Sequence, residues 1–319
     1  MIKFGNPQVG KDELGKIKEV FDSKIFVHGN QTEQFENDFK SEFGYDFALS
    51  VANCTAGLHL AHFSLTKNLD SKVRSKSEVI CTAMTHVATA HAIELTGLKP
   101  IFVDCQSNDG NVDISLLRNA INMDTVGIAA MHFNGVPCDI NSITNIAEQE
   151  NLYIIEDCAI ALGATVNGKP VGSFGDAGTF SFHPVKQMTT GEGGMVTLKN
   201  KKIYDELKIE RAFGVDRNFI ERDKAGVYDV PLLGFNYRMA EIPAAMGIKQ
   251  LEKFRTAEEI RKRNFINLKN EISQISNLRI KGEQITDGRA YYCLIAEVLG
   301  DSISRDALAH KLKDKGIQT

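Results

Sequence analysis

The stretch Ile140-Asn-Ser-Ile-Thr-Asn-Ile-Ala-Glu-Gln-Glu-Asn-Leu-Tyr-Ile-Ile-Glu-Asp157 contains the pattern that decides the fold. Its first part, residues 140–150, is typical of a helix, and residues 152–156 form a short and mostly apolar run. Such a run is typical of a strand in a sheet that is buried between two helical layers. The stretch therefore predicts a helix followed by a buried strand that ends in a carboxylate.

The same alternation of strand and helix extends from about residue 48 to residue 200. It predicts an α/β fold with a mainly parallel sheet and right-handed crossovers. Strands are expected at residues 47–51, 79–83, 101–104, 126–131, 152–156, 177–182 and 195–198, and helices at 56–65, 88–96, 114–121 and 140–150.

The flanking regions predict further elements and a second domain. Phe35, Phe39 and Phe43 are spaced four apart and predict one apolar face on a helix at residues 34–43. Beyond Leu198 we expect a helix at 201–211, a long functional loop at 213–234, a helix at 239–254, a strand at 291–299 and a helix at 303–313. The predicted division is a large domain of residues 1–245 and a smaller α+β domain of residues 246–319.

Composition excludes several classes of protein. The 319 residues carry a net charge of −4, which argues against a nucleic-acid binder. The six cysteines are scattered singly, so neither a disulfide framework nor a zinc site is expected. The N-terminus has no apolar signal core, and no apolar run approaches the ~18 residues that a membrane span needs. We therefore expect a cytoplasmic protein that is not associated with membranes.

Two candidate reactive groups follow buried strands, where ligands of open α/β sheets collect. Asp157 ends a strand and suits an acid that stays ionised beside a cation, or one that caps the next helix. Lys186 follows the strand at 177–182 and precedes a glycine-rich turn. Desolvation would make its amine nucleophilic, as a Schiff-base lysine requires, whereas the alternative is a solvated loop lysine.

Two further segments could hold a planar phosphorylated ligand. Residues 51–57 lead from a strand into a helix expected from Ala56, where backbone N–H groups and the Thr55 hydroxyl would bind an anion. The alternative is that Thr55 is a plain N-cap. His86 follows another strand and could lie against a ring, or be an ordinary structural or surface residue. A phosphate cradle, a stacking residue, a carboxylate and an amine together suit pyridoxal phosphate.

The sequence resembles the DegT/StrS-type nucleotide-sugar aminotransferases, which have the aspartate aminotransferase fold (type I). Seven motifs occur in the order in which they occur in that family. They are Cys54-Thr-Ala-Gly-Leu-His-Leu60, Thr85-His-Val-Ala-Thr-Ala-His-Ala92, Pro100-Ile-Phe-Val-Asp104, His132-Phe-Asn-Gly-Val-Pro137, Ile155-Glu-Asp157, the segment 180–194, and Leu233-Gly-Phe-Asn-Tyr-Arg-Met239.

The resemblance implies a role for each matching residue. Lys186 would hold the cofactor covalently, Asp157 would face its pyridine nitrogen, and His86 would stack on its ring. Ser181, Thr55 and the backbone of Cys54 would bind its phosphate. Asn236 would reach the phosphate of the neighbouring subunit's cofactor, so the resemblance implies a homodimer with shared active sites.

The chain departs from the family pattern at several positions. Cys54 stands where many members have glycine, and Asn53 stands where serine is common. Ile160 replaces a glutamine or histidine that contacts the cofactor's phenolic oxygen, and isoleucine cannot form that hydrogen bond. Members that dehydrate sugars have histidine in place of Lys186, so this lysine favours amino transfer. The family usually continues beyond Thr319, so we expect the small domain to be incomplete.

The predicted reaction moves an amino group from an amino acid, expected to be glutamate, to a keto-deoxysugar linked to a nucleotide. The segment 182–186 resembles that of family members that aminate C4 of a keto-dideoxy sugar, and the resemblance implies a pathway to amino sugars of surface polysaccharides. One alternative is a cofactor-binding protein that does not transaminate, because the sugar-binding part is missing. A second, a nucleotide-dependent oxidoreductase, is disfavoured because no G-x-G-x-x-G follows the first strand.

Overall fold

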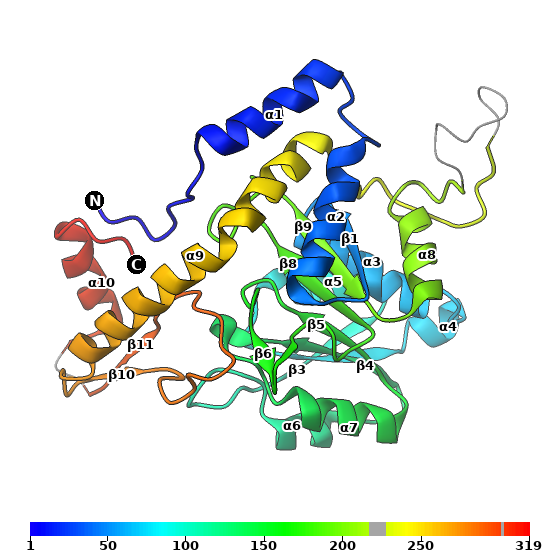
Figure 1. Ribbon diagram of the computed structural model, residues 1–319. Helices are drawn as coiled ribbons and strands as arrows, with labels where there is room; N and C mark the ends of the chain where they lie inside the picture. Colours follow the sequence, from blue (N-terminus) through cyan, green and yellow to red (C-terminus); the bar gives the residue numbers. More distant parts are fainter. Residues whose placement is uncertain (217–227, 301–302) are drawn as a thin grey trace.

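The computed structural model describes residues 1–216, 228–300 and 303–319. A seven-stranded sheet, in the order β1-β9-β8-β5-β4-β2-β3, forms its centre (Figure 1). The β1–β9 and β9–β8 pairs are antiparallel and the remaining pairs are parallel. These strands are β1 (Phe47–Val51), β2 (Glu78–Thr82), β3 (Lys99–Val103), β4 (Thr125–Met131), β5 (Tyr153–Asp157), β8 (Ala177–Ser181) and β9 (Gly194–Leu198).

Helices cover both faces of the sheet, as a buried parallel sheet requires. One face packs against α3 (Cys54–Thr66), α5 (Val87–Leu95) and α8 (Lys201–Glu210). The other packs against α2 (Asn30–Phe43), α6 (Ile114–Ala120), α7 (Ile140–Glu150) and α9 (Glu241–Ile272). The remaining elements are α1 (Lys11–Ser23), α4 (Ser71–Arg74), η1 (Phe133–Gly135), α10 (Arg305–Asp314) and the short strands β6 (Thr165–Val166), β7 (Lys169–Pro170), β10 (Leu278–Ile280) and β11 (Ala296–Val298).

The α/β fold is confirmed, and each of the seven predicted sheet strands lies within two residues of its expected bounds. Four predictions about helices and strands need correction. The helix expected from residue 34 begins at Asn30, the helix expected from Ala56 begins at Cys54, the helix expected at 239–254 continues to Ile272, and the strand expected at 291–299 is confined to 296–298. The elements α1, α4, β6, β7 and β10 were not predicted from the sequence. The long loop predicted at 213–234 lies partly outside the described residues.

The predicted domain division falls between residues 245 and 246, inside α9. This helix crosses the division without a break: its first turns pack against α1 and α2, and its other end leads to β10 (Figure 1). The division therefore stays a prediction. None of the helices that the structure describes combines the length and the apolar character that a membrane crossing requires.

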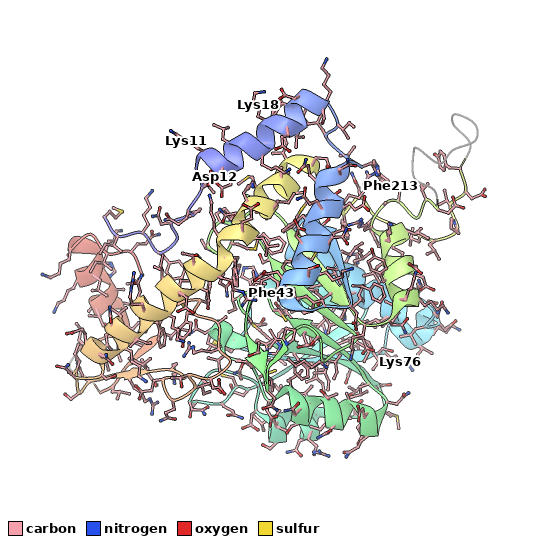
Figure 2. All side chains as sticks on the ribbon, viewed as in Figure 1. Lys11, Asp12, Lys18, Phe43, Lys76 and Phe213 are labelled. Carbon is pink, nitrogen blue, oxygen red and sulfur yellow. The ribbon has the colours of Figure 1, made fainter. Side chains whose placement is uncertain are left out.

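The phenylalanine face predicted on α2 is confirmed as the centre of one core. Phe35 and Phe39 are fully buried, and Phe39 lies edge-on to Phe182 with ring centroids 5.9 Å apart. Phe43, labelled in Figure 2, closes the lower end of α2 against Phe254 of α9. This cluster joins α2 and α9 to the strand that precedes Lys186.

On the opposite face, α3 contributes a histidine that is buried without charge. The His62 ring is fully buried, and its Nδ1 lies 2.9 Å from the hydroxyl of Tyr153 on β5. Its Nε2 has no hydrogen-bond partner in the described part of the chain. Burial, with a smaller contribution from His59, lowers the pKa of His62 to about 3.

This histidine should make the stability of the protein depend on pH. Below the ordinary pKa of histidine, about 6.5, the unfolded chain gains a proton that the folded chain excludes until its own pKa is reached. We therefore expect the free energy of unfolding to fall by about 1.4 kcal/mol per pH unit between pH 6.5 and 3. In the variant His62→Asn, which retains a polar group opposite Tyr153, this component should disappear. Urea unfolding of both proteins at pH 7 and pH 5 measures it, and equal slopes would contradict the assignment.

Candidate active site

The carboxyl ends of β4, β5 and β8 meet at one edge of the sheet and place Asp157 there. Asp157 is paired in register with Met131 on β4 and with Thr179 on β8. Its side chain points to the face that carries α3 and α5, because neighbouring Ile155 on the same side of β5 belongs to the core beneath α3. The strand-end location predicted for Asp157 is therefore confirmed.

Hydrogen bonds satisfy the Asp157 carboxylate on both oxygens, although the residue is only 2% exposed. Oδ1 accepts a hydrogen bond from the backbone N–H of Ala159 at 3.0 Å, and Oδ2 accepts one from the hydroxyl of Thr89 on α5 at 2.7 Å. Burying a carboxylate is unfavourable unless such donors, or a cation, stabilise its charge. Asp157 is thus held in one orientation beneath the edge of the sheet.

Lys186 lies in the turn that follows β8, where its backbone N–H donates to the carbonyl of His183 at 2.9 Å. Its Nζ lies 5.5 Å from the centroid of the Tyr292 ring. Burial lowers the pKa of the Lys186 amine below its ordinary value, while Cys54, Asp157 and Cys293 act in the opposite direction. The amine and the carboxylate therefore share one electrostatic environment, and the neutral, nucleophilic form of Lys186 is favoured by desolvation.

The N-terminus of α3 lies beside these two groups. The N-cap is Asn53, whose Oδ1 accepts from Ala56 at 2.8 Å, so the alternative that Thr55 caps the helix is wrong. The first N–H groups of a helix have no intrahelical partner, and among the described contacts those of Cys54 and Thr55 remain available. The partly exposed Thr55 hydroxyl adds a third donor at this anion-binding end of the helix.

Glycine at position 194 lets β9 approach this helix end. A side-chain carbon at Gly194 would meet the backbone nitrogen of Cys54 and the carbonyl oxygen of Phe180, each at 2.8 Å. The buried Cys54 thiol lies close enough to Asp157 for the carboxylate to help burial raise its pKa well above the ordinary value. The amine, the carboxylate and the helix N-terminus are thus packed into one compact region.

The other predicted residues lie at the rim. His86 is exposed and is the N-cap of α5, where its Nδ1 accepts from Ala88 at 3.2 Å. Ser181 ends β8 and is half-buried; its Oγ accepts a long hydrogen bond, 3.4 Å, from the N–H of His183.

Asn236 is exposed, and its Oδ1 accepts from the Arg238 guanidinium at 2.8 Å. The segment that contains it is joined to the turn before α3 by a hydrogen bond from Ala52 to the carbonyl of Tyr237 at 2.7 Å. Arg238 also lies against Phe213, labelled in Figure 2, with its guanidinium carbon 5.0 Å from the ring centroid.

The departure at Ile160 is visible in the structure. Its side chain is buried, and its backbone carbonyl accepts from the side-chain amide of Gln187 at 2.8 Å. Isoleucine donates no hydrogen bond from its side chain. The side-chain amide of Gln187, the residue after Lys186, therefore bonds to the backbone of Ile160.

Sequence reasoning missed a buried pair next to Asp157 on the opposite face. His132 and Glu156 are fully buried, and Nε2 of His132 lies 3.0 Å from Oε2 of Glu156. Cys158 lies close to both, so the three residues have the spacing of potential metal ligands. Glu156 also accepts the backbone N–H groups of Gly172, Phe174 and Gly175, each at 2.7 Å. Burial would raise the pKa of Glu156, but the bonds from His132 and from the backbone hold it below its ordinary value. Four donors saturate the carboxylate, so the cluster stabilises β5 and leaves Glu156 no lone pair for a metal.

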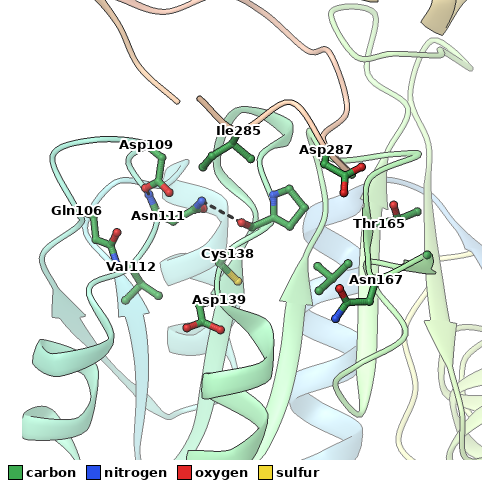
Figure 3. A pocket seen from close by; sticks show the side chains of 14 residues that line it. Gln106, Asp109, Asn111, Val112, Cys138, Asp139, Thr165, Asn167, Ile285 and Asp287 are labelled. Carbon is green, nitrogen blue, oxygen red and sulfur yellow. Dashed lines mark hydrogen bonds between the residues drawn. The ribbon is translucent and has the colours of Figure 1, made fainter. Parts of the chain in front are cut away.

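A separate cavity of about 350 Å³ lies near the N-terminus of α7 (Figure 3). Its lining is mostly polar and includes Gln106, Asn111, Asp139, Asn167 and Asp287. None of the predicted site residues lines this cavity. The chemistry predicted from the sequence therefore belongs to the region around Lys186.

Comparison with known proteins shows which family this chain resembles along its length. The model of the DegT/DnrJ/EryC1/StrS aminotransferase family matches residues 7–319. A GDP-perosamine synthase of Escherichia coli O157:H7 is 34% identical over 324 residues, which cover 100% of this chain and 83% of the relative.

Solved structures of sugar-modifying enzymes have the same fold as this chain. A sugar aminotransferase of Micromonospora echinospora superposes with a TM-score of 0.90 at 27% identity, covering 100% of this chain and 85% of the other. The Escherichia coli GDP-4-keto-6-deoxy-D-mannose-3-dehydratase, solved with bound hydrated pyridoxal phosphate, gives a TM-score of 0.89 at 27% identity, covering 100% and 84%.

Proposed function

The chain belongs to the DegT/DnrJ/EryC1/StrS aminotransferase family, and we propose that it moves the amino group of glutamate to C4 of a nucleotide-linked keto-deoxysugar. The family is one of sugar aminotransferases and related sugar-modifying enzymes that use pyridoxal phosphate. The observation that carries the proposal is the environment that Lys186 shares with Asp157, because it pairs a desolvated amine with a fixed carboxylate.

The residues present fit this cofactor. Lys186 supplies the amine, Asp157 supplies the anionic partner, and the free N–H groups at the start of α3 suit a phosphate. Ser181 would add a hydroxyl to the phosphate site, and His86 would lie against the ring. When bound, pyridoxal phosphate supplies an aldehyde that captures amines and a ring that accepts the electron pair left on carbon.

The side chains of the protein would carry out the proton transfers. In the first half of the reaction, Lys186 Nζ would carry the proton from the α-carbon of glutamate to the cofactor, which keeps the nitrogen, while one water supplies the keto oxygen of 2-oxoglutarate. In the second half, Lys186 would deliver that proton to the sugar carbon that receives the nitrogen, and the carbonyl oxygen of the sugar leaves as water. Asp157 would hold a proton on the ring nitrogen throughout.

A second copy of the chain would complete the site in this proposal. Asn236 and His86 are exposed, and the surface around them carries exposed apolar residues. These include Val87 beside His86 and Leu233 near Asn236, with exposed fractions of 59% and 70%. Exposed apolar residues bordered by polar ones are typical of a surface that a partner covers. In a homodimer Asn236 would reach the phosphate held by the partner copy.

The test follows nitrogen from donor to product. The purified chain, loaded with pyridoxal phosphate, is mixed with ¹⁵N-glutamate and GDP-4-keto-6-deoxy-D-mannose, the sugar named for the E. coli structural relative. We expect mass spectrometry to find ¹⁵N in a GDP-linked amino sugar, with one 2-oxoglutarate formed per amine transferred. A visible-absorbance change with glutamate but no labelled sugar would point to a different keto-sugar. Cofactor binding without any change on adding glutamate would favour the non-transaminating binder.

A further inference from the structure

We propose that the hydroxyl groups of Thr85 and Thr89 form a positioning relay that orients the Asp157 carboxylate toward the cofactor. The inference rests on the proposed function, since it assumes that Asp157 faces the ring nitrogen of pyridoxal phosphate. It assigns a role to two residues of the loop and helix that carry His86. Neither residue was singled out in the sequence, although both lie within the motif at residues 85–92.

The contacts form a continuous chain that ends at the carboxylate. Thr89 lies on α5, is fully buried, and places its Oγ1 2.7 Å from Oδ2 of Asp157. The hydroxyl of Thr85, which is half-buried, lies 2.7 Å from that of Thr89. Both distances are typical of strong hydroxyl hydrogen bonds.

The inventory of donors fixes the direction of this chain. An ionised carboxylate only accepts, so the single proton of the Thr89 hydroxyl is donated to Asp157. The proton between the two threonines must then come from Thr85, since Thr89 has no second one to give. Both hydroxyl dipoles therefore point toward the carboxylate, and each polarises the next. Hydrogen bonds donated to a carboxylate favour its charged form.

The relay also fixes the orientation of the carboxylate. Its other oxygen accepts from the backbone N–H of Ala159, which lies two residues along the chain from Asp157. One anchor therefore comes from the segment after β5 and the other from α5, so rotation about the side-chain bond would break one of them. Since His86 is the N-cap of α5, the same helix start carries the relay and the residue proposed to stack on the ring.

The way Thr89 uses its proton distinguishes a positioning role from ordinary packing. A threonine inside a helix commonly donates to a backbone carbonyl one turn earlier. Thr66 on α3 does so: it is 2% exposed, and its hydroxyl donates to the carbonyl of His62 at 2.7 Å. Thr66 is therefore a matched control for losing a buried hydroxyl that does not touch Asp157.

The experiment compares four variants with the wild-type protein: Thr89→Val, Thr89→Ser, Thr85→Val and Thr66→Val. The first readout is the dissociation constant for pyridoxal phosphate, and the second is the ¹⁵N chemical shift of the ring nitrogen in the labelled cofactor as a function of pH. We expect Thr89→Val to weaken cofactor binding by about tenfold, and Thr85→Val by about threefold, because one charge-assisted bond is lost or weakened.

The nitrogen signal separates electrostatics from folding. In Thr89→Val the ring nitrogen should lose its proton at a lower pH than in the wild type, while Thr89→Ser and Thr66→Val should match the wild type. An unchanged ¹⁵N titration in both Thr89→Val and Thr85→Val would overturn the relay, and so would equal binding losses in Thr89→Val and Thr66→Val. A wild-type protein that fails to bind the cofactor would instead refute the proposed function. If Thr89→Val does not fold, Thr85→Val decides the matter.

Discussion

Replacing Lys186 by alanine is expected to lower kcat for amino transfer by about 10⁴-fold or more. In the proposed reaction the amine both holds the cofactor and moves the substrate proton, so its removal eliminates two contributions to the rate. The remaining phosphate site and Asp157 should still bind pyridoxal phosphate, more weakly and without a covalent bond. Steady-state rates, with mass spectrometry of the borohydride-treated protein to detect covalent cofactor, measure both effects.

Two further variants make the result on Lys186 specific. Lys186→Arg retains the positive charge but not the reactivity, because a guanidinium stays protonated, so we expect it to be as inactive as alanine. Lys199→Ala removes an exposed lysine at the end of β9 that donates to the carbonyl of Phe174, and it should leave kcat unchanged. Normal turnover by Lys186→Ala would refute the assigned mechanism.

The variant Asp157→Asn is expected to lower kcat by about 10²–10³-fold, which is typical for losing one preorganised electrostatic partner. The amide has almost the same shape but no charge to hold a proton on the ring nitrogen. Without cofactor, the variant should be as stable as the wild type or more stable, since a buried carboxylate is replaced by a neutral group. Thermal unfolding of the cofactor-free proteins, together with steady-state rates, separates stability from chemistry.

The same variant should change the pH dependence in a defined direction. The charge of Asp157 raises the pKa of Lys186 against the lowering by burial. Removing that charge therefore lowers the pKa of the amine, and the acidic limb of the residual activity should move to lower pH. The control is Asp176→Asn at the other end of β5, where the carboxylate accepts from Ile154 at 2.8 Å. It should reduce stability and leave the pH profile in place, and a shift there would contradict the assignment to Asp157.

The sheet strands and the ends that carry Asp157 and Lys186 could be predicted because each depends on local sequence. Short apolar runs fix the strands, and a charged side chain that follows one is conspicuous. The cap at Asn53 could have been found too, since asparagine is a preferred N-cap, but the neighbouring threonine offered an equally plausible hydroxyl.

Long-range contacts could not be predicted in the same way. Glu13 on α1 is buried through Lys253 and Gln250 on α9, at 2.8 Å from each, and nothing in the local sequence of α1 indicates these contacts. The second half of α9 is partly exposed and rich in charged residues. It therefore lacks the apolar periodicity that marks the first half, although its residues favour a helix. Tyr292 reaches Lys186 across 106 positions in the chain, and no spacing rule connects them.

The order of strands in the sheet has a consequence for how the protein comes to be folded. The edge strand β1 pairs with β9, so Val51 meets Gly194, a residue made 143 positions later during synthesis. The start of α3 cannot settle against Gly194 until most of the chain has emerged from the ribosome. Contacts between such distant positions form slowly. The candidate active site should therefore be among the last parts of the molecule to form, after the parallel strands have assembled.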